Sequence, residues 1–144
     1  MEHDDTRRLL GECDLGIQMA VSSINEVLPM VESFHLRQEL SNCRRAHELL
    51  RDQAQSLLRQ CKADSKRPSP VAKGMSWMKT NLKLALQPGD QSVADLMVDG
   101  CNQGVKLLHR YCNRYPDASP EARSLASQLI QAEQRLSRDL QSYL

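Results

Sequence analysis

The chain has 144 residues, enough for a single domain with a substantial core, and its 19 basic and 18 acidic residues nearly balance. Only 3% of the residues are aromatic, so the core must be aliphatic and few rings are available for stacking on nucleic acid bases. No apolar run approaches the roughly 18 residues of a membrane span, and the polar start does not resemble a secretory signal. We therefore expect a cytoplasmic domain over residues 1–144 with no membrane association.

Apolar residues recur at alternating spacings of three and four in the first half of the chain, as in amphipathic helices. The first such stretch predicts a helix over residues 5–31, with a cap within residues 4–6 and a kink or an end at Pro29. Ser33 can cap a second helix over residues 34–62. The apolar stripe of the second helix consists of Leu36, Leu40, Cys43, His47, Leu50, Ala54, Leu57 and Cys61.

Three more helices are predicted in the second half: a short one over residues 70–86 and longer ones over 91–114 and 120–143. The helix over 91–114 carries two parallel apolar stripes and two glycines, Gly100 and Gly104. A glycine inside a helix costs roughly 1 kcal/mol relative to alanine. We therefore expect both glycines to face a neighbouring helix at close range.

The lengths of the connections indicate how the helices are arranged. Short connections join the first two long helices and the last two, so each pair should form an antiparallel hairpin. The short helix lies in the long connection between the pairs, which can travel most of the length of the bundle. The sequence predicts an all-α, ferritin-like, up-down-down-up four-helix bundle with a short helix in the long crossover.

Five segments, all in the second half of the chain, carry a resemblance to a known family. They are Gly74–Lys79, Val93–Val105, Leu125–Ala126, Leu129–Gln134 and Leu140–Leu144. In these segments the chain resembles an uncharacterised family of ferritin-like four-helix-bundle proteins from anaerobic Gram-positive bacteria. The resemblance implies the ferritin-like fold, and it implies no activity.

The first functional hypothesis for such a fold is a di-metal centre. That centre needs a Glu on each of two helices and a Glu-x-x-His on each of the other two. The chain has one Glu-x-x-His, from Glu32 to His35, at a predicted helix junction. The helix over 91–114 has no Glu and the helix over 120–143 has no His, so the ligands for a di-iron centre are missing.

Two polar residues, His47 and Glu133, nevertheless occupy positions on apolar stripes. We expect each to lie at the edge of the bundle, or to hydrogen-bond to the other or to a neighbour, because an unpaired buried polar group costs roughly 1–3 kcal/mol. Cys43 lies one turn before His47, and such a pair can supply two zinc ligands, with Cys13 or Cys101 completing the site. Buried cysteine is more often an apolar filler, so we expect no bound metal and no cofactor.

Motifs for catalysis are missing from the sequence. It contains no Gly-rich phosphate loop, no Gly-x-Ser-x-Gly and no Cys-x-x-Cys, and its five cysteines fit reduced thiols. Only Cys43 has a base at helical spacing, and its position on the apolar stripe should hide it from a substrate. We expect that the protein is not an enzyme.

Charge and apolar surface indicate binding to other molecules. Residues 37–83 contain 11 basic and 4 acidic side chains, which can complement the acidic neighbouring helices or form a face for nucleic acid. The few aromatics and a pI near 7.7 count against nucleic acid. The short helix has more apolar surface than one stripe, so Trp77, Met78 and Leu82 should form a contact for a second copy or a protein partner.

The resulting prediction is a non-catalytic interaction or assembly protein. A divergent ferritin-like metal-binding or oxidative-stress protein is one alternative, and a nucleic-acid-associated protein is the other.

Overall fold

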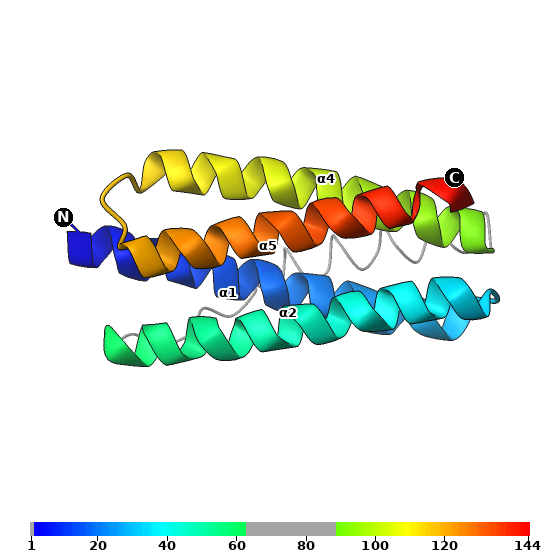
Figure 1. The fold of residues 1–144 in the computed structure, drawn as a ribbon, viewed down its shortest axis with the longest axis horizontal. Helices are drawn as coiled ribbons and strands as arrows, with labels where there is room; N and C mark the ends of the chain where they lie inside the picture. Colours follow the sequence, from blue (N-terminus) through cyan, green and yellow to red (C-terminus); the bar gives the residue numbers. More distant parts are fainter. Residues whose placement is uncertain (1, 63–88) are drawn as a thin grey trace.

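The computed structural model describes residues 2–62 and 89–144, which form four long helices and contain no strand (Figure 1). The helices are α1 (Glu2–Val27), α2 (Phe34–Gln60), α4 (Asp90–Arg114) and α5 (Pro120–Asp139). The prediction of an all-α bundle is confirmed. The helix predicted over 70–86, with Trp77, Met78 and Leu82, lies outside the described residues.

Two of the predicted helix starts are confirmed by their capping hydrogen bonds. The Ser33 hydroxyl accepts the backbone N–H of Leu36 at 3.2 Å, and the Ser119 hydroxyl accepts that of Ala122, also at 3.2 Å. Each bond pairs one of the N–H groups that the first turn of a helix leaves without a partner.

The start of α1 differs from the prediction, whereas the predicted end of the helix at Pro29 is confirmed. This helix begins at Glu2, so residues 4–6 lie within it and do not cap it. At its other end the chain passes into a single 3₁₀ turn over Leu28–Met30, in which Pro29 has no N–H to continue the α-helix. A second 3₁₀ turn over Gln141–Tyr143 follows α5, which ends before the predicted residue 143.

Hydrogen bonds between loops and helices fix the directions of the four helices. The Asp90 carboxylate at the start of α4 accepts the backbone N–H groups of Glu32 and Ser33, just before α2, at 2.8 and 2.9 Å. At the opposite end, the Thr6 hydroxyl in α1 accepts the backbone N–H of Ser119, just before α5, at 2.8 Å. Helices α2 and α4 therefore run in one direction and α1 and α5 in the other (Figure 1).

Each of α1 and α5 packs against all three other long helices. The buried residues of the four helices form two apolar clusters. The first cluster lies toward the end where α1 and α5 begin and contains Leu9, Leu10, Cys13, Ile17, Leu50, Ala54, Leu58, Leu108, Ala118, Ala122, Leu125, Ala126 and Leu129. The second lies toward the other end and contains Ile24, Val27, Val31, Leu36, Leu40, Val93, Ala94, Met97, Cys101, Leu136 and Leu140.

The expectation for the two glycines of α4 is wrong for Gly100. A side chain added at Gly100 would meet no atom within 4 Å, and the residue is exposed. A Cβ at Gly104 would lie 3.8 Å from the carboxyl carbon of Glu133. The two residues are four apart, about 40° around the helix axis, and α4 turns only the second one toward α5.

Candidate functional site

A polar pair separates the two apolar clusters near the middle of the bundle. His47 on α2 is 0% exposed, Glu133 on α5 is 8% exposed, and His47 Nε2 lies 2.9 Å from Glu133 Oε1. Along α2 the histidine falls between Leu40 and Leu50, which belong to different clusters. Of the arrangements that the sequence left open, the hydrogen bond between the two residues is the one observed.

Both ring nitrogens of His47 lie at hydrogen-bonding distance from oxygen atoms of the protein. Nδ1 lies 2.9 Å from the backbone carbonyl oxygen of Cys43, which can only accept, so Nδ1 carries a hydrogen. Nε2 faces the Glu133 carboxylate and also donates. Burial alone would lower the pKa of His47, but its interactions with Cys43 and Glu133 outweigh burial and raise the pKa from 6.5 to about 10. The raised pKa and the two oxygen partners both favour the imidazolium form at neutral pH.

Two thiols flank this ion pair. The Sγ of Cys43 lies 3.4 Å from His47 Nδ1, and Cys43 is partly exposed and packs against the second apolar cluster. Cys101 on α4 is buried; burial, and then the negative charge of Glu133, raises the pKa of its thiol far above the ordinary value. The polar layer is therefore built from α2, α4 and α5, and we define it as Cys43, His47, Cys101 and Glu133.

A metal ion in this layer would have to displace a hydrogen bond of His47. Both nitrogens of His47 face oxygen atoms of the protein, and a histidine binds a metal through a free nitrogen lone pair. Within residues 2–62 and 89–144, no group of three or more His, Cys, Asp or Glu is arranged to hold a metal ion. Cys13, the other thiol considered for such a site, belongs to the first apolar cluster.

The Glu-x-x-His pair at the helix junction has a different environment. His35 is mostly exposed, lies 3.4 Å from Glu39, and stacks on Tyr143 with 6.3 Å between ring centroids. Glu32 is exposed, and its backbone N–H donates to Asp90. The pair is part of the end of the bundle.

Apolar side chains are exposed at this same end. Met30 is 42% exposed, Phe34 is 68% exposed, and the C-terminal Leu144 is 52% exposed. The stacking of Tyr143 on His35 brings the C-terminal end of the described chain to the first turn of α2, which begins at Phe34. We call Met30, Phe34 and Leu144 the apolar end.

A second buried ionic group was not predicted. Asp14 on α1 is fully buried; it accepts a hydrogen bond from Gln18 at 2.8 Å, and Arg51 Nε on α2 lies 3.6 Å from its other oxygen. Neither Asp14 Oδ1 nor Arg51 Nε makes a hydrogen bond. The sequence did contain a signal, because Asp14 stands four residues after Leu10 and three before Ile17, on the apolar face of α1.

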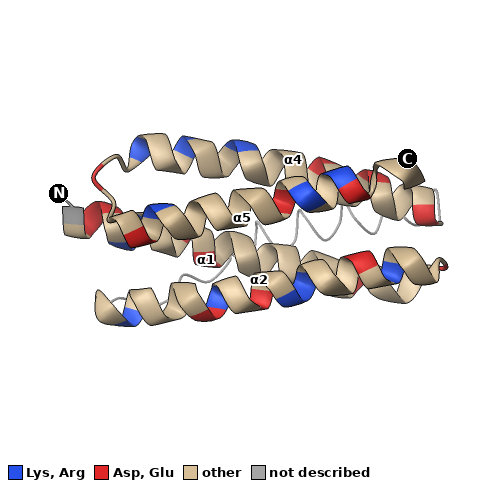
Figure 2. Ribbon diagram, in the orientation of Figure 1, with Lys and Arg blue, Asp and Glu red and all other residues tan. Residues whose placement is uncertain are grey.

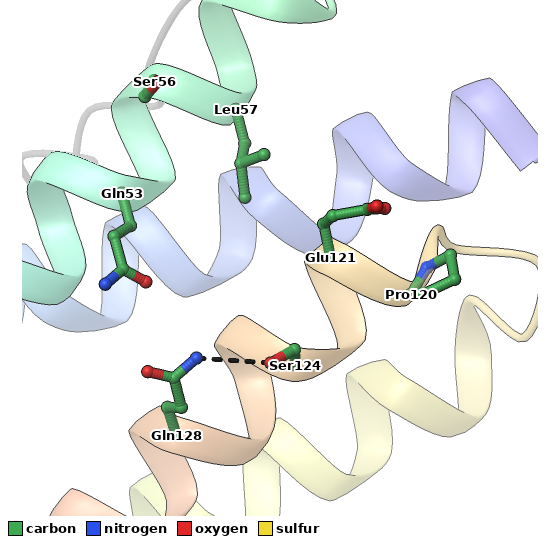
Figure 3. A pocket seen from close by; sticks show the side chains of 7 residues that line it. All are labelled: Gln53, Ser56, Leu57, Pro120, Glu121, Ser124 and Gln128. Atoms are coloured by element: carbon green, nitrogen blue, oxygen red, sulfur yellow. Dashed lines mark hydrogen bonds between the residues drawn. The ribbon is translucent and has the colours of Figure 1, made fainter.

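A shallow, open groove lies between α2 and α5 (Figure 3). It is lined by Gln53, Ser56, Leu57, Pro120, Glu121, Ser124 and Gln128. Among the described lining residues, Gln128 donates a hydrogen bond to Ser124 at 3.3 Å, and Glu121 is ionisable. Small-molecule sites are concave and mostly apolar, whereas this groove is open and its described lining is mainly polar.

The basic stretch does not form a continuous basic face along α2. Figure 2 shows acidic and basic residues interspersed on this helix. Arg37 donates to the carbonyl of Val31 and Arg44 to Asn25, both at 2.8 Å, while Arg51 faces Asp14. Much of the positive charge in the described part of residues 37–83 serves contacts within the bundle.

Comparison with protein-family models, with curated proteins and with solved structures found no match. The resemblance to the ferritin-like family therefore stays a prediction. Among the described helices, none combines the length and the apolar character needed to cross a membrane.

Proposed function

We propose that the chain is a non-catalytic, cytoplasmic helical bundle that functions by binding proteins. The first partner that we propose is a second copy of the same chain. The observation that carries the proposal is the apolar end. Single exposed apolar residues are common on protein surfaces, but a group of three large ones at one end is typical of a contact surface. Burying a phenylalanine or methionine side chain is worth about 1.5–3 kcal/mol, so this end can contribute substantially to association.

A second copy is the first partner to consider because a twofold contact buries the same apolar surface from both chains. Trp77, Met78 and Leu82 lie outside the described residues and stay a predicted contact for a second copy or a protein partner. The helix directions support a ferritin-like arrangement, in which the crossover between α2 and α4 contains the short helix over 70–86.

The two alternative functions make different demands. A nucleic-acid-binding protein needs basic side chains free to reach phosphates, whereas Arg37, Arg44 and Arg51 have partners within the bundle. A metal-binding protein should contain stoichiometric iron, manganese or zinc after purification. Elemental analysis tests that alternative directly.

The oligomeric state tests the proposed function. Light scattering coupled to gel filtration should give a mass near twice the 16.3 kDa of one chain, falling toward one chain on dilution. The double variant Phe34→Ser and Leu144→Ser should be monomeric at concentrations where the unmodified protein is dimeric.

Leu49→Ser is the matched control, because Leu49 is also an exposed leucine but lies in the middle of α2, away from the apolar end. It should leave the dimer intact. A monomer at every concentration, or a dimer that survives the loss of both Phe34 and Leu144, would contradict self-association through this end.

A further inference from the structure

Three groups of the polar layer lie in an order that has chemical consequences. The Cys43 sulfur lies 3.4 Å from His47 Nδ1, and His47 Nε2 lies 2.9 Å from a Glu133 oxygen. Thiol, imidazole and carboxylate follow one another across α2 and α5. This order activates a cysteine nucleophile, since the imidazole lies against the sulfur and the carboxylate orients the imidazole.

We propose that Cys43 is a reactive thiol, and that hydrogen peroxide oxidises it to a sulfenic acid. A cation beside a cysteine favours the thiolate, which is the nucleophilic form of the side chain. His47 supplies that cation, and the Glu133 carboxylate keeps it charged. His47 and Glu133 are positioning residues, because they act through the sulfur and do not themselves react.

The proposed reaction also needs access from solvent to Cys43. Cys43 is partly exposed, so a molecule as small as hydrogen peroxide can reach its sulfur from solvent, whereas His47 behind it is fully buried. A thiolate needs both a stabilising charge and access in order to react.

The other four cysteines lack this combination. Cys13 and Cys101 are buried, and burial raises the pKa of both thiols. Burial also raises the pKa of Cys112. Cys61 is partly exposed like Cys43, but it lies at the C-terminal end of α2, 14 residues after His47 and away from the ion pair. Cys61 is therefore an internal control of similar exposure.

The proposed reaction is a two-electron oxidation. Cys43 loses its proton to solvent, and the thiolate sulfur attacks one oxygen of the peroxide. The sulfur–oxygen bond forms as the oxygen–oxygen bond breaks, and the departing hydroxide takes a proton from solvent to become water. Sulfur is oxidised, the peroxide is reduced, and His47 keeps both of its protons.

The first experiment compares the five thiols within one molecule. The full-length, reduced protein is treated with hydrogen peroxide in the presence of dimedone, which traps sulfenic acids, and the labelled peptides are quantified by mass spectrometry. Cys43 should be labelled at least about tenfold faster than Cys61, and Cys43→Ser should remove the main labelled peptide. Equal labelling of the two thiols in the unmodified protein, or faster labelling of Cys61, would overturn the proposal. This result does not depend on any substitution of His47 or Glu133.

The second experiment tests the positioning residues. The titratable groups that face Cys43 are His47 on its own helix, Cys101 on α4 and Glu133 on α5, so the pH profile of alkylation by iodoacetamide should be measured for each thiol. His47→Gln should slow alkylation of Cys43 at pH 7 by about tenfold or more and move its profile to higher pH. Glu133→Gln keeps a hydrogen-bonding side chain without the charge and should have a smaller effect in the same direction.

Unchanged Cys61 kinetics in these variants would show that the bundle is intact. A Cys43 profile that is the same in the unmodified protein and in both variants would overturn the role of the ion pair. General acceleration at all five thiols would mean that a variant had unfolded, in which case the comparison within the unmodified protein decides the proposal.

Discussion

The carboxylate of Asp14 is buried and incompletely paired. It is fully buried, yet one of its oxygens has only a 3.6 Å ionic contact with Arg51 and no hydrogen bond. Taking a charge out of water is expensive, and a loosely paired buried charge recovers only part of that expense. The two partners are unequal, because the Arg51 side chain is 40% exposed and can be hydrated without Asp14.

This asymmetry predicts opposite results for two substitutions. Asp14→Leu should leave the free energy of unfolding unchanged or raise it by about 1–4 kcal/mol, because it removes a buried charge and Arg51 can turn to solvent. Arg51→Met should lower it by about 3–5 kcal/mol, because the carboxylate stays buried without a cation. Urea denaturation at pH 7 measures both. A larger loss from Asp14→Leu than from Arg51→Met would show that the pair is net stabilising.

The raised pKa of His47 predicts how stability depends on pH. The folded state binds the proton more tightly than the unfolded state, with a pKa of about 10 against 6.5. The resulting stabilisation is complete below pH 6.5 and is lost as the pH rises through 10. Relative to His47→Gln, the free energy of unfolding should therefore fall with pH across this window, by at most about 1.4 kcal/mol per unit.

Chemical denaturation of both proteins between pH 6 and 10.5, roughly the span of the linkage, measures this difference. His47→Gln also changes the ionisation of Cys43, so the comparison is repeated with two proteins that both carry Cys43→Ser. A difference that does not fall as the pH rises would mean that folding does not raise the pKa of His47.

At the scale of single helices, the two glycines of α4 are opportunities for stabilisation. A methyl group at Gly100 would meet no atom within 4 Å, so Gly100→Ala should raise the free energy of unfolding by about 1 kcal/mol through helix propensity. Gly104→Ala should gain less, because its methyl group would cover the Glu133 carboxyl at 3.8 Å and remove some of its hydration. Thermal denaturation of the two variants should give the higher melting temperature for Gly100→Ala. The reverse order would mean that α4 turns Gly100, and not Gly104, toward α5.

The helix starts at Ser33 and Ser119 could be predicted because each cap joins residues only three apart. The roles of Asp90 and Thr6 could not be predicted, because their partners are distant in the sequence. Asp90 accepts from residues 58 and 57 positions away, and Thr6 accepts from one 113 positions away. No local pattern marks an aspartate as the partner of a distant loop. The sequence instead suggested a conventional cap at residues 4–6, which are inside α1.

The buried faces could be predicted in outline, and their limits come from helix geometry. A strict repeat of seven drifts by about 20° per heptad around a straight helix. Over the 27 residues of α2 this drift accumulates, and near its end Leu58 is buried where the predicted stripe had Leu57. The polar layer could be predicted in part for the same reason. His47 and Glu133 lie on the predicted apolar stripes, so a hydrogen bond between them could be anticipated. The position of Cys101 beside them depends on the rotation of α4 about its axis, which the sequence does not give.

At the scale of the whole molecule, the polar layer interrupts what would otherwise be one apolar core. The clusters on either side are both aliphatic and contain residues of all four long helices. Leucine, valine and alanine side chains of similar size distinguish poorly between one helix register and the next, whereas a buried hydrogen-bonded pair is satisfied in a single register. We therefore interpret the pair of His47 and Glu133 as a device that fixes how α5 aligns with α2.

A double-mutant cycle separates this role from a contribution to stability. His47→Leu and Glu133→Leu should each lower the free energy of unfolding by about 3–5 kcal/mol, because each leaves one charged partner buried alone. The double variant joins the two clusters into one apolar core and should be as stable as the unmodified protein or more so. If the pair fixes the register, this stable double variant should bind hydrophobic dyes, show broadened amide signals in NMR spectra or form mixed oligomers, because several alignments of α5 become comparable in energy. A double variant that unfolds cooperatively and gives one sharp set of signals would show that the aliphatic clusters alone specify the alignment, and losses that simply add would show that the two side chains do not act as a pair.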